Sequence, residues 1–354
     1  MRPMFNRSGR AGNYAYTVSR VKAKKALLLK DEDYNKMLQM SVPEISRYIS
    51  ESGYQKEMAD LAGRLEGIDL VEHATYENMA KVFGSILGAS QGELNTMVAA
   101  YLEKWDIWNL KVILRGKSYG LGADEVREDL VPAGSLKSES LEKLIALDNV
   151  DDILANYCKM EHVTIPQDVL AAYKASGNLG EIEDYLDKYH YVRLLKSIDP
   201  SSRPTRMFQD YVRMEIDVRN LETILKLKAE GIYGEEVMKY IIPGGRQIDN
   251  RYAMQLANAE TIAAAASDLS QLDFYEIIKE LVEADNVSIR DVVTEMKKYE
   301  IAEAKKFSHM YPLSVVPILD YMIHKEIEVG NIRTISRGVE SGLDTETIKG
   351  LLVI

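Results

Sequence analysis

Apolar side chains recur every three or four residues along much of this chain. After Ser90 they follow one another at Leu94, Met97, Val98, Tyr101, Leu102, Trp105, Trp108 and Val112. This spacing keeps one face of a helix apolar and predicts a single helix of about 25 residues, near 37 Å long. No segment alternates apolar and polar residues with β-branched side chains over a sustained stretch. The pattern therefore predicts an all-α protein.

Capping signals indicate where some of these helices begin. Ser41-Val42-Pro43-Glu44 reads as a capping box with proline in the first turn, where its missing N–H is harmless. Ser90-Gln91-Gly92-Glu93 has the same serine-to-glutamate spacing. We therefore expect Ser90 to cap the long helix that follows it.

The chain contains a threefold internal repeat at a constant offset of 111 residues. Each copy reads acidic, branched apolar, any residue, Asn, Leu or Ile. The repeat continues through an isoleucine and a glycine, which tolerates the left-handed conformation that ends a helix. The matching segments are Asp106 to Leu110, Asp217 to Leu221 and Glu328 to Ile332, followed by Ile113, Ile224 and Ile335 and by Gly120, Gly231 and Gly342.

The repeat divides the chain into three similar helical units of about 110 residues. We place them at residues 11–134, 135–245 and 246–354, after a flexible basic N-terminus at 1–10. Three such units can close around an axis and leave a central depression, or stack into a curved solenoid. The spacing alone does not choose between these arrangements.

The acidic residue and the asparagine of each copy share one helix face and could build a site. The pairs are Asp106 with Asn109, Asp217 with Asn220, and Glu328 with Asn331. A reaction centre is normally used once, whereas this pair occurs in every copy. We therefore interpret it as structural, since an unpaired polar group inside a protein costs about 1–3 kcal/mol.

Charge is distributed unevenly along the 354 residues. The whole chain has a formal net charge of −11, which disfavours nucleic acid as a partner. Residues 1–30, in contrast, contain eight basic residues and no acidic one. This segment is either a solvated basic helix or a surface that contacts an anionic partner or lipid headgroups. Its candidate contact residues are Arg20, Lys22, Lys24 and Lys25.

We find no convincing catalytic, cofactor or metal-binding constellation. The single cysteine, Cys158, excludes a disulfide framework, and no two of the five histidines are four residues apart. The segment from Asp148 to Asp152 resembles, in reversed spacing, the magnesium motif of all-helical isoprenoid enzymes. Because it aligns with a helix start in the first copy, an acidic first turn is the simpler interpretation. A Mg-dependent enzyme using Asp148, Asp151 and Asp152 stays as an alternative.

The repeated motif, with the start Asn13-Tyr14-Ala15-Tyr16, resembles the C subunit of A-type (archaeal) ATP synthases, which is similar to the d subunit of vacuolar-type ATPases. The resemblance covers nearly the whole chain. Glutamate at Glu328 and glycine at Gly330 depart mildly from the pattern of the other copies. They leave open whether the third copy has the same role.

The resemblance implies a funnel of three helical units around a pseudo-threefold axis, without nucleotide, cofactor or metal. It implies a non-catalytic rotor subunit that seats on the cytoplasmic face of the membrane rotor ring. Its pocket would receive the central stalk of subunits D and F and couple proton or sodium translocation to ATP synthesis or hydrolysis. Residues 1–30 are then expected to face the ring or lipid, and an acidic pocket to receive the stalk. A freestanding helical scaffold is the other alternative.

Overall fold

The computed structural model describes residues 12–284 and 286–354, so the predicted flexible segment 1–10 lies outside the described residues. The described residues form nineteen helices and no strand. The prediction of an all-α protein is confirmed.

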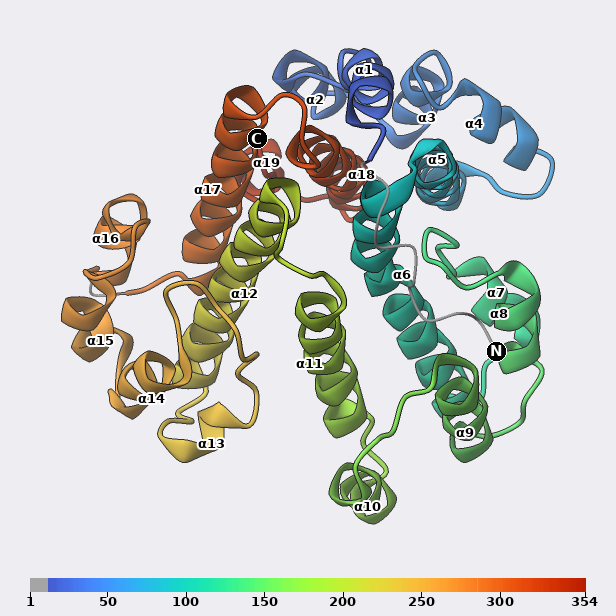
Figure 1. Cartoon of the computed structure of the whole chain (residues 1–354). Coiled ribbons are helices and arrows are strands. Elements are labelled where there is room, and N and C mark those ends of the chain that lie inside the picture. Colours follow the sequence, from blue (N-terminus) through green and yellow to red (C-terminus); the bar gives the residue numbers. More distant parts are fainter. Residues whose placement is uncertain (1–11, 285) are drawn as a thin grey trace.

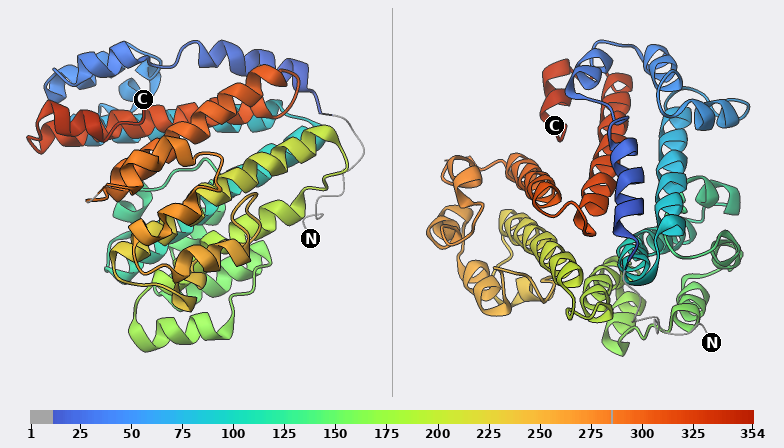
Figure 2. Two further views of the ribbon diagram at one scale, coloured as in Figure 1. Left: turned by 90° about the vertical axis from the view of Figure 1, so that its left-hand side faces the viewer. Right: turned by 45° about the horizontal axis from the view of Figure 1, so that its top comes forward.

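Three long helices organise the fold: α6 (Gly92–Ser118), α12 (Arg203–Ala229) and α18 (Val316–Glu340). Each runs beside a second long helix, and these partners are α11 (Gly180–Ser197), α17 (Ile289–Met310) and α5 (Gly67–Ala89). Helix α1 (Tyr14–Lys25) lies across α18 and α5. Figures 1 and 2 show the long helices meeting at one end of the molecule and spreading apart toward the other.

Short helices cover the outer parts of the long ones (Figure 1). After α6 come α7 (Ala123–Glu128), α8 (Ser138–Ile145), α9 (Val150–Glu161) and α10 (Gln167–Ser176). After α12 come α13 (Glu235–Met238), α14 (Asn250–Asn258), α15 (Ile262–Leu269) and α16 (Tyr275–Val282). In the described part of the chain α18 is followed by α19 (Thr345–Gly350) alone, while α2 (Asp31–Met37), α3 (Val42–Ser50) and α4 (Gln55–Leu61) precede α5.

Each long helix contributes its two halves to different hydrophobic clusters. The first halves of α6, α12 and α18 join in one central core, which includes Leu102, Phe208 and Leu319. The second halves enter three separate outer clusters, one with α7–α11, one with α13–α17 and one with α2–α5 and α19. The three long helices therefore pack together through their first halves, whereas each second half packs into an outer cluster of its own.

The third outer cluster is built from segments far apart in the sequence. Ile332 and Ile335 of α18 pack there with Ile45 of α3 and Met58 of α4. The short helices that accompany α18 thus come mostly from before α5 in the sequence. The unit boundaries at 134 and 245 and the pseudo-threefold axis stay predictions, because this packing describes clusters and not a symmetry operation.

The repeated asparagines make the same pair of hydrogen bonds in all three copies. Asn109 donates to the carbonyl of Val131 and accepts from its N–H, both at 2.8 Å. Asn220 pairs with Ile242 at 2.8 and 2.8 Å, and Asn331 pairs with Val353 at 2.9 and 3.0 Å. Each side chain thereby holds the chain 22 residues further on. In each copy the interaction fixes the backbone just after the first short helix that follows the long one, which is α7, α13 or α19.

The repeated acidic residues receive backbone N–H groups just before a short helix. Asp106 accepts from Ser135 and Leu136 at 2.8 and 2.9 Å, ahead of α8. Asp217 accepts from Gln247 and Ile248 at 2.8 and 2.9 Å, ahead of α14. Gly134 and Gly245 pass so close to these carboxylates that an added Cβ would overlap them. Glycine is required there by the close approach of the backbone.

Glu328 also accepts a backbone N–H group just before a short helix, but that helix is α2, about 300 residues earlier in the sequence. It accepts from the N–H of Leu29 and from the hydroxyl of Tyr54. Leu29 stands two residues before α2, as Leu136 stands two before α8 and Ile248 two before α14. The longer glutamate side chain therefore ties α2–α4 to α18. It also pairs with Lys325 at 2.9 Å.

Helix ends follow the sequence in part. Gly120, Gly231 and Gly342 have φ of 74°, 78° and 70°, the left-handed conformation after α6, α12 and α18. Ser41 and Glu44 form the expected capping box of α3. The expectation for Ser90 was wrong, because its hydroxyl donates to the carbonyl of Ile86 and α6 begins only at Gly92. A serine that follows a helix competes for that helix's last carbonyl groups.

Replacing Asn220 with alanine removes the hydrogen-bond partners of two buried backbone groups, the N–H and the C=O of Ile242. We expect the free energy of unfolding in urea to fall by about 2–5 kcal/mol, since each stranded group costs about 1–3 kcal/mol. Asn156→Ala is the matched control, because its exposed amide bonds only one carbonyl within its own helix. A loss no larger than that of the control would contradict the anchoring role.

Replacing Glu328 with alanine should loosen α2–α4 from α18. Hydrogen exchange is expected to rise first in the amides of 29–61, ahead of those in α12 and α14, because Leu29 and Tyr54 lose their acceptor. Glu346→Ala on the exposed face of α19 serves as the control. Uniform acceleration over the whole chain would argue against a local closure by Glu328.

Candidate functional site

A second set of repeat-related residues meets where the three long helices leave the central core. Positions 104, 215 and 326 precede the acidic residue of each motif copy by two residues and are occupied by Lys104, Glu215 and Glu326. The Lys104 ammonium lies 2.7 and 2.8 Å from the two carboxylate oxygens of Glu326 and so joins α6 to α18. On α12, Glu215 accepts from the Tyr191 hydroxyl at 2.5 Å and lies 3.5 Å from Arg219.

Glu300 of α17 adds a third carboxylate to this group. It accepts a hydrogen bond from Tyr211 at 2.7 Å, and among the described residues it has no ion-pair partner within 4.0 Å. Burial, followed by the negative charge of Glu215, raises the pKa of Glu300 to about 7. Arg219 and Lys104 act on the same carboxyl in the opposite direction, so all these groups share one electrostatic environment.

We call Lys104, Glu215, Arg219, Glu300 and Glu326 the polar cluster. Burial opposes the ionisation of Glu215, but Arg219 and Lys104 outweigh it and hold the pKa of this carboxyl below its usual range. Burial raises the pKa of Glu326. Beside the cluster, burial lowers the pKa of His190 to about 3, so this imidazole is neutral at pH 7. The polar cluster therefore holds three carboxyl groups and two basic side chains, and with a pKa of about 7 the Glu300 carboxyl is only partly ionised at pH 7.

Two carboxylate oxygens in the polar cluster have no hydrogen-bond partner among the described residues, Oε1 of Glu326 and Oε2 of Glu215, but the first lies 2.7 Å from the Lys104 ammonium. Glu215 is 5% exposed, and its Oε2 atom has no donor within the described part of the chain. Buried carboxylate oxygens are normally satisfied, because an unpaired one costs considerable free energy. This atom is therefore a candidate acceptor for a group from outside the chain.

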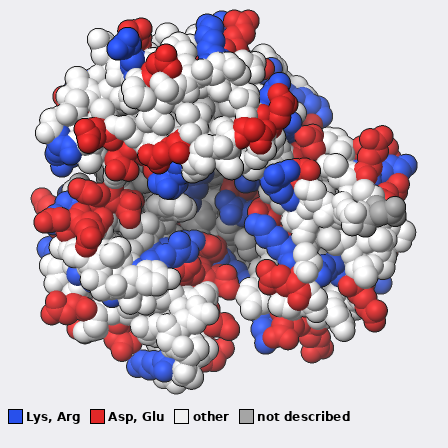
Figure 3. Space-filling model, turned by 180° about the vertical axis from the view of Figure 1, so that it is seen from behind, with Lys and Arg blue, Asp and Glu red and all other residues white. Residues whose placement is uncertain are grey.

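One helical turn further on, positions 108, 219 and 330 border open space. The Trp108 side chain is 40% exposed, and the Arg219 side chain is 50% exposed. Gly330 has nothing within 4 Å of where a Cβ would stand. Seen from behind the view of Figure 1, the molecule is hollowed at its centre, and both basic and acidic side chains gather around the opening (Figure 3). We call the space between the diverging second halves of α6, α12 and α18 the central hollow. The polar cluster lies on these helices and on α17 where they leave the common core, and we assign it to the floor of the hollow.

The basic residues singled out in the sequence have unequal environments. Lys25 forms a 2.6 Å ion pair with Asp320, whose side chain is only 3% exposed, so it fastens α1 to α18. Lys24 is half-buried, whereas Arg20 and Lys22 are exposed. The start of α1 is fixed by Asn13, which donates to Ala89 and accepts from Gln91 at 2.8 Å each.

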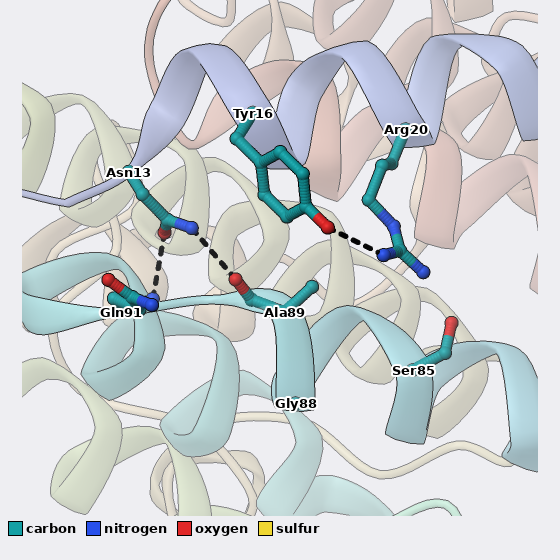
Figure 4. Close-up of a pocket in the computed structure, with 7 residues that line it drawn as sticks. All are labelled: Asn13, Tyr16, Arg20, Ser85, Gly88, Ala89 and Gln91. Carbon is teal, nitrogen blue, oxygen red and sulfur yellow. Dashed lines mark hydrogen bonds between the residues drawn. The ribbon is translucent and has the colours of Figure 1, made fainter.

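A shallow hollow of about 730 Å³ lies beside this anchored end of α1 (Figure 4). Within this surface pocket the Arg20 guanidinium donates to the Tyr16 hydroxyl at 2.9 Å, and Ser85 and Gly88 of α5 also line it. Tyr16 is 55% exposed. The outer face of α1 therefore presents cations and a large aromatic ring to the outside.

The acidic segment of the enzyme alternative forms an exposed helix start. Asp152 is the third residue of α9, and its N–H is capped by Asn149 at 2.9 Å. Asp148 and Asp151 are exposed, and Asp151 lies 3.9 Å from Lys174. Across residues 12–284 and 286–354, no three His, Cys, Asp or Glu side chains gather so that they could hold a metal ion. The magnesium hypothesis gains no support from this geometry.

Sequence reasoning missed the polar cluster although the signal was present. Lys104, Glu215 and Glu326 stand at the same 111-residue offset as the motif, but their unlike charges hide the relation. Glu300 has no such marker, because it comes from the partner helix α17.

No helix in the described ranges is long and apolar enough to cross a lipid bilayer. The model of the family described as "ATP synthase (C/AC39) subunit" matches residues 17–351. The chain is also similar to proteins named as the C subunit of A-type ATP synthase. The one from Methanococcoides burtonii is 35% identical over 348 residues, covering 98% of this chain and 96% of that protein.

Two further relatives carry the same name. The protein from Methanosarcina mazei is 36% identical over 347 residues (97% of this chain, 94% of that protein), and the protein from Archaeoglobus fulgidus is 34% identical over 346 residues (98% of each). These matches span nearly the full length of the chain and confirm the family suggested by the repeated motif. The chain belongs to the family of ATP synthase (C/AC39) subunits.

Proposed function

We propose that this chain is the non-catalytic coupling element of the central rotor in an A-type or V-type ATP synthase. In this role it is a socket between the central stalk, built from subunits D and F, and the membrane rotor ring. Rotation driven by proton or sodium translocation then passes through it to ATP synthesis, or in reverse from ATP hydrolysis. It works as a peripheral protein on the cytoplasmic face of the membrane.

The observation that carries this proposal is the central hollow at the point where α6, α12 and α18 leave one core. A socket must accept an inserted partner and must be stiff where it is loaded. The hollow meets the first requirement, since Gly330 and the half-exposed Trp108 border free space. The common core beneath it, shared by all three long helices, meets the second.

Energetics favour a broad seat over a few isolated ion pairs. One elementary charge crossing about 100 mV releases roughly 2.3 kcal/mol, and several charges act in each catalytic step. An exposed salt bridge contributes only about 0–1 kcal/mol. A coupling element therefore needs a wide surface with many contacts, such as the walls of the hollow provide.

The outer face of α1 supports a second contact, with the ring or with lipid headgroups. Arg20 and Lys22 are exposed, Leu27 is 78% exposed, and the described residues 12–30 contain no acidic side chain. A basic face with apolar side chains suits an anionic surface next to a membrane.

Filling the hollow should block the stalk and leave the fold intact. Gly330→Trp places a large ring into free space on an exposed helical position and improves helix propensity by about 0.5 kcal/mol. We expect binding of the purified D–F stalk complex to weaken more than tenfold in calorimetric titration, at an unchanged melting temperature.

Gly350→Trp in α19 is the matched control, since this glycine is also exposed with nothing within 4 Å. It should bind the stalk as the unmodified chain does. A freestanding scaffold would bind the stalk in neither case, and equal stalk binding by all three proteins would place the contact elsewhere.

Reversing the charge of the exposed α1 face tests the ring contact. We expect Arg20→Glu with Lys22→Glu to weaken binding to the detergent-solubilised rotor ring at least tenfold at low salt, with a smaller difference at high salt. Lys25 is left in place, because its reversal would strand Asp320. The control is Lys143→Glu with Lys159→Glu on the exposed faces of α8 and α9. Unchanged ring binding at every salt concentration would refute this orientation.

A further inference from the structure

We propose that the polar cluster at the floor of the central hollow binds one basic side chain, a lysine or arginine, of the protein that fills the hollow. The inference rests on the proposed function, because it assigns the chemistry of the stalk's tip. The inferred basic side chain belongs to the part of the stalk that reaches the floor of the central hollow.

The charge balance of the polar cluster is the first support. Lys104 is paired with Glu326, and Arg219 lies beside Glu215. Glu300 is left with only the Tyr211 hydroxyl among the described side chains. Glu300 is therefore the carboxyl group of the cluster without a basic partner, and an added cation at short range would pair with it and favour its ionised form.

The unsatisfied oxygen of Glu215 is the second support. Its Oε1 accepts from Tyr191, while Oε2 has no donor within the described residues although the residue is only 5% exposed. A guanidinium or ammonium group carries several donors and could serve this oxygen and the Glu300 carboxylate together. A carbonyl or an anion offers no donor and would add repulsion.

The wall above the floor suits the same kind of ligand. Trp108 is half-exposed one helical turn above Lys104, and the face of an indole ring attracts a passing cation. On α18, Gly330 adds no side chain to the wall and has nothing within 4 Å of a Cβ position, so an extended side chain can pass there. A bare metal ion fits less well, because Lys104 and Arg219 interleave with the carboxylates.

The direct test uses a triarginine peptide as the probe and the fluorescence of Trp108 as the readout. Trp105→Phe removes the other tryptophan of the chain, since there are two. A saturable change in Trp108 emission is expected with triarginine and none with triglutamate. Glu300→Gln and Glu215→Gln should each weaken triarginine binding at least fivefold, whereas Glu295→Gln, a half-exposed position on the same helix α17, should not. Absence of saturable triarginine binding would overturn the inference.

The second test uses the D–F stalk complex and predicts effects of opposite sign from neighbouring residues. Glu300→Gln should weaken stalk binding about tenfold, and Lys104→Gln should strengthen it, because it removes the resident competitor of the incoming cation. A general structural disturbance would weaken binding in both variants, and that result would contradict the inference.

These two tests separate the inference from the proposed function. Stalk binding that Gly330→Trp abolishes but Glu300→Gln leaves unchanged would overturn the inference and keep the socket. Triarginine binding without any stalk binding by the unmodified chain would overturn the socket and keep the cation site.

Discussion

The fold depends on a buried amide in the middle of each long helix. Asn109, Asn220 and Asn331 each satisfy both polar groups of one backbone residue 22 positions later. These two hydrogen bonds form only when the chain after the long helix returns to the asparagine. If it does not, the buried amide and the backbone N–H and C=O are left unpaired, which is costly. The asparagine thus fixes where the chain must come back after the helix ends. The acidic residue one turn earlier fixes the start of a further short helix, which is α8 for Asp106, α14 for Asp217 and the distant α2 for Glu328.

This constraint explains why the outer clusters can diverge while the core stays common. The first half of each long helix contributes apolar residues to the central core, and the second half carries its own short helices. Since the anchors act within each outer cluster, the three clusters need little contact with one another. The space between them remains open and becomes the central hollow.

The sequence predicted much of this organisation and failed at definable points. The all-α class, the length of α6 and the positions of Gly120, Gly231 and Gly342 followed from helical periodicity and from a constant offset. The start of α6 was misplaced because Ser90 bonds backward to Ile86, a choice that local sequence cannot reveal. The pairing of Glu328 with Leu29 was not predictable, since it joins residues 299 apart.

The candidate site was harder to predict than the fold, for a physical reason. Burial periodicity identifies residues that avoid water, but the polar cluster consists of charged residues whose charges compensate across different helices. Lys104 and Glu326 look unrelated in sequence and become a pair only when α6 and α18 meet. In the sequence Glu300 looks like an ordinary surface glutamate. Only the folded structure places it beside Tyr211 and Glu215.

The contact between Glu328 and Leu29 bears on how the polypeptide matures as it is synthesised. The helices α2–α4 leave the ribosome long before α18 and α19, which cover their apolar faces in the folded protein. During translation α5 can already pack on α3 and α4, but the part of their apolar faces that α18 and α19 cover stays exposed, while the clusters around α6 and α12 can close. Nascent chains should therefore be most vulnerable to aggregation and proteases through residues 31–61, until α18 and α19 have emerged.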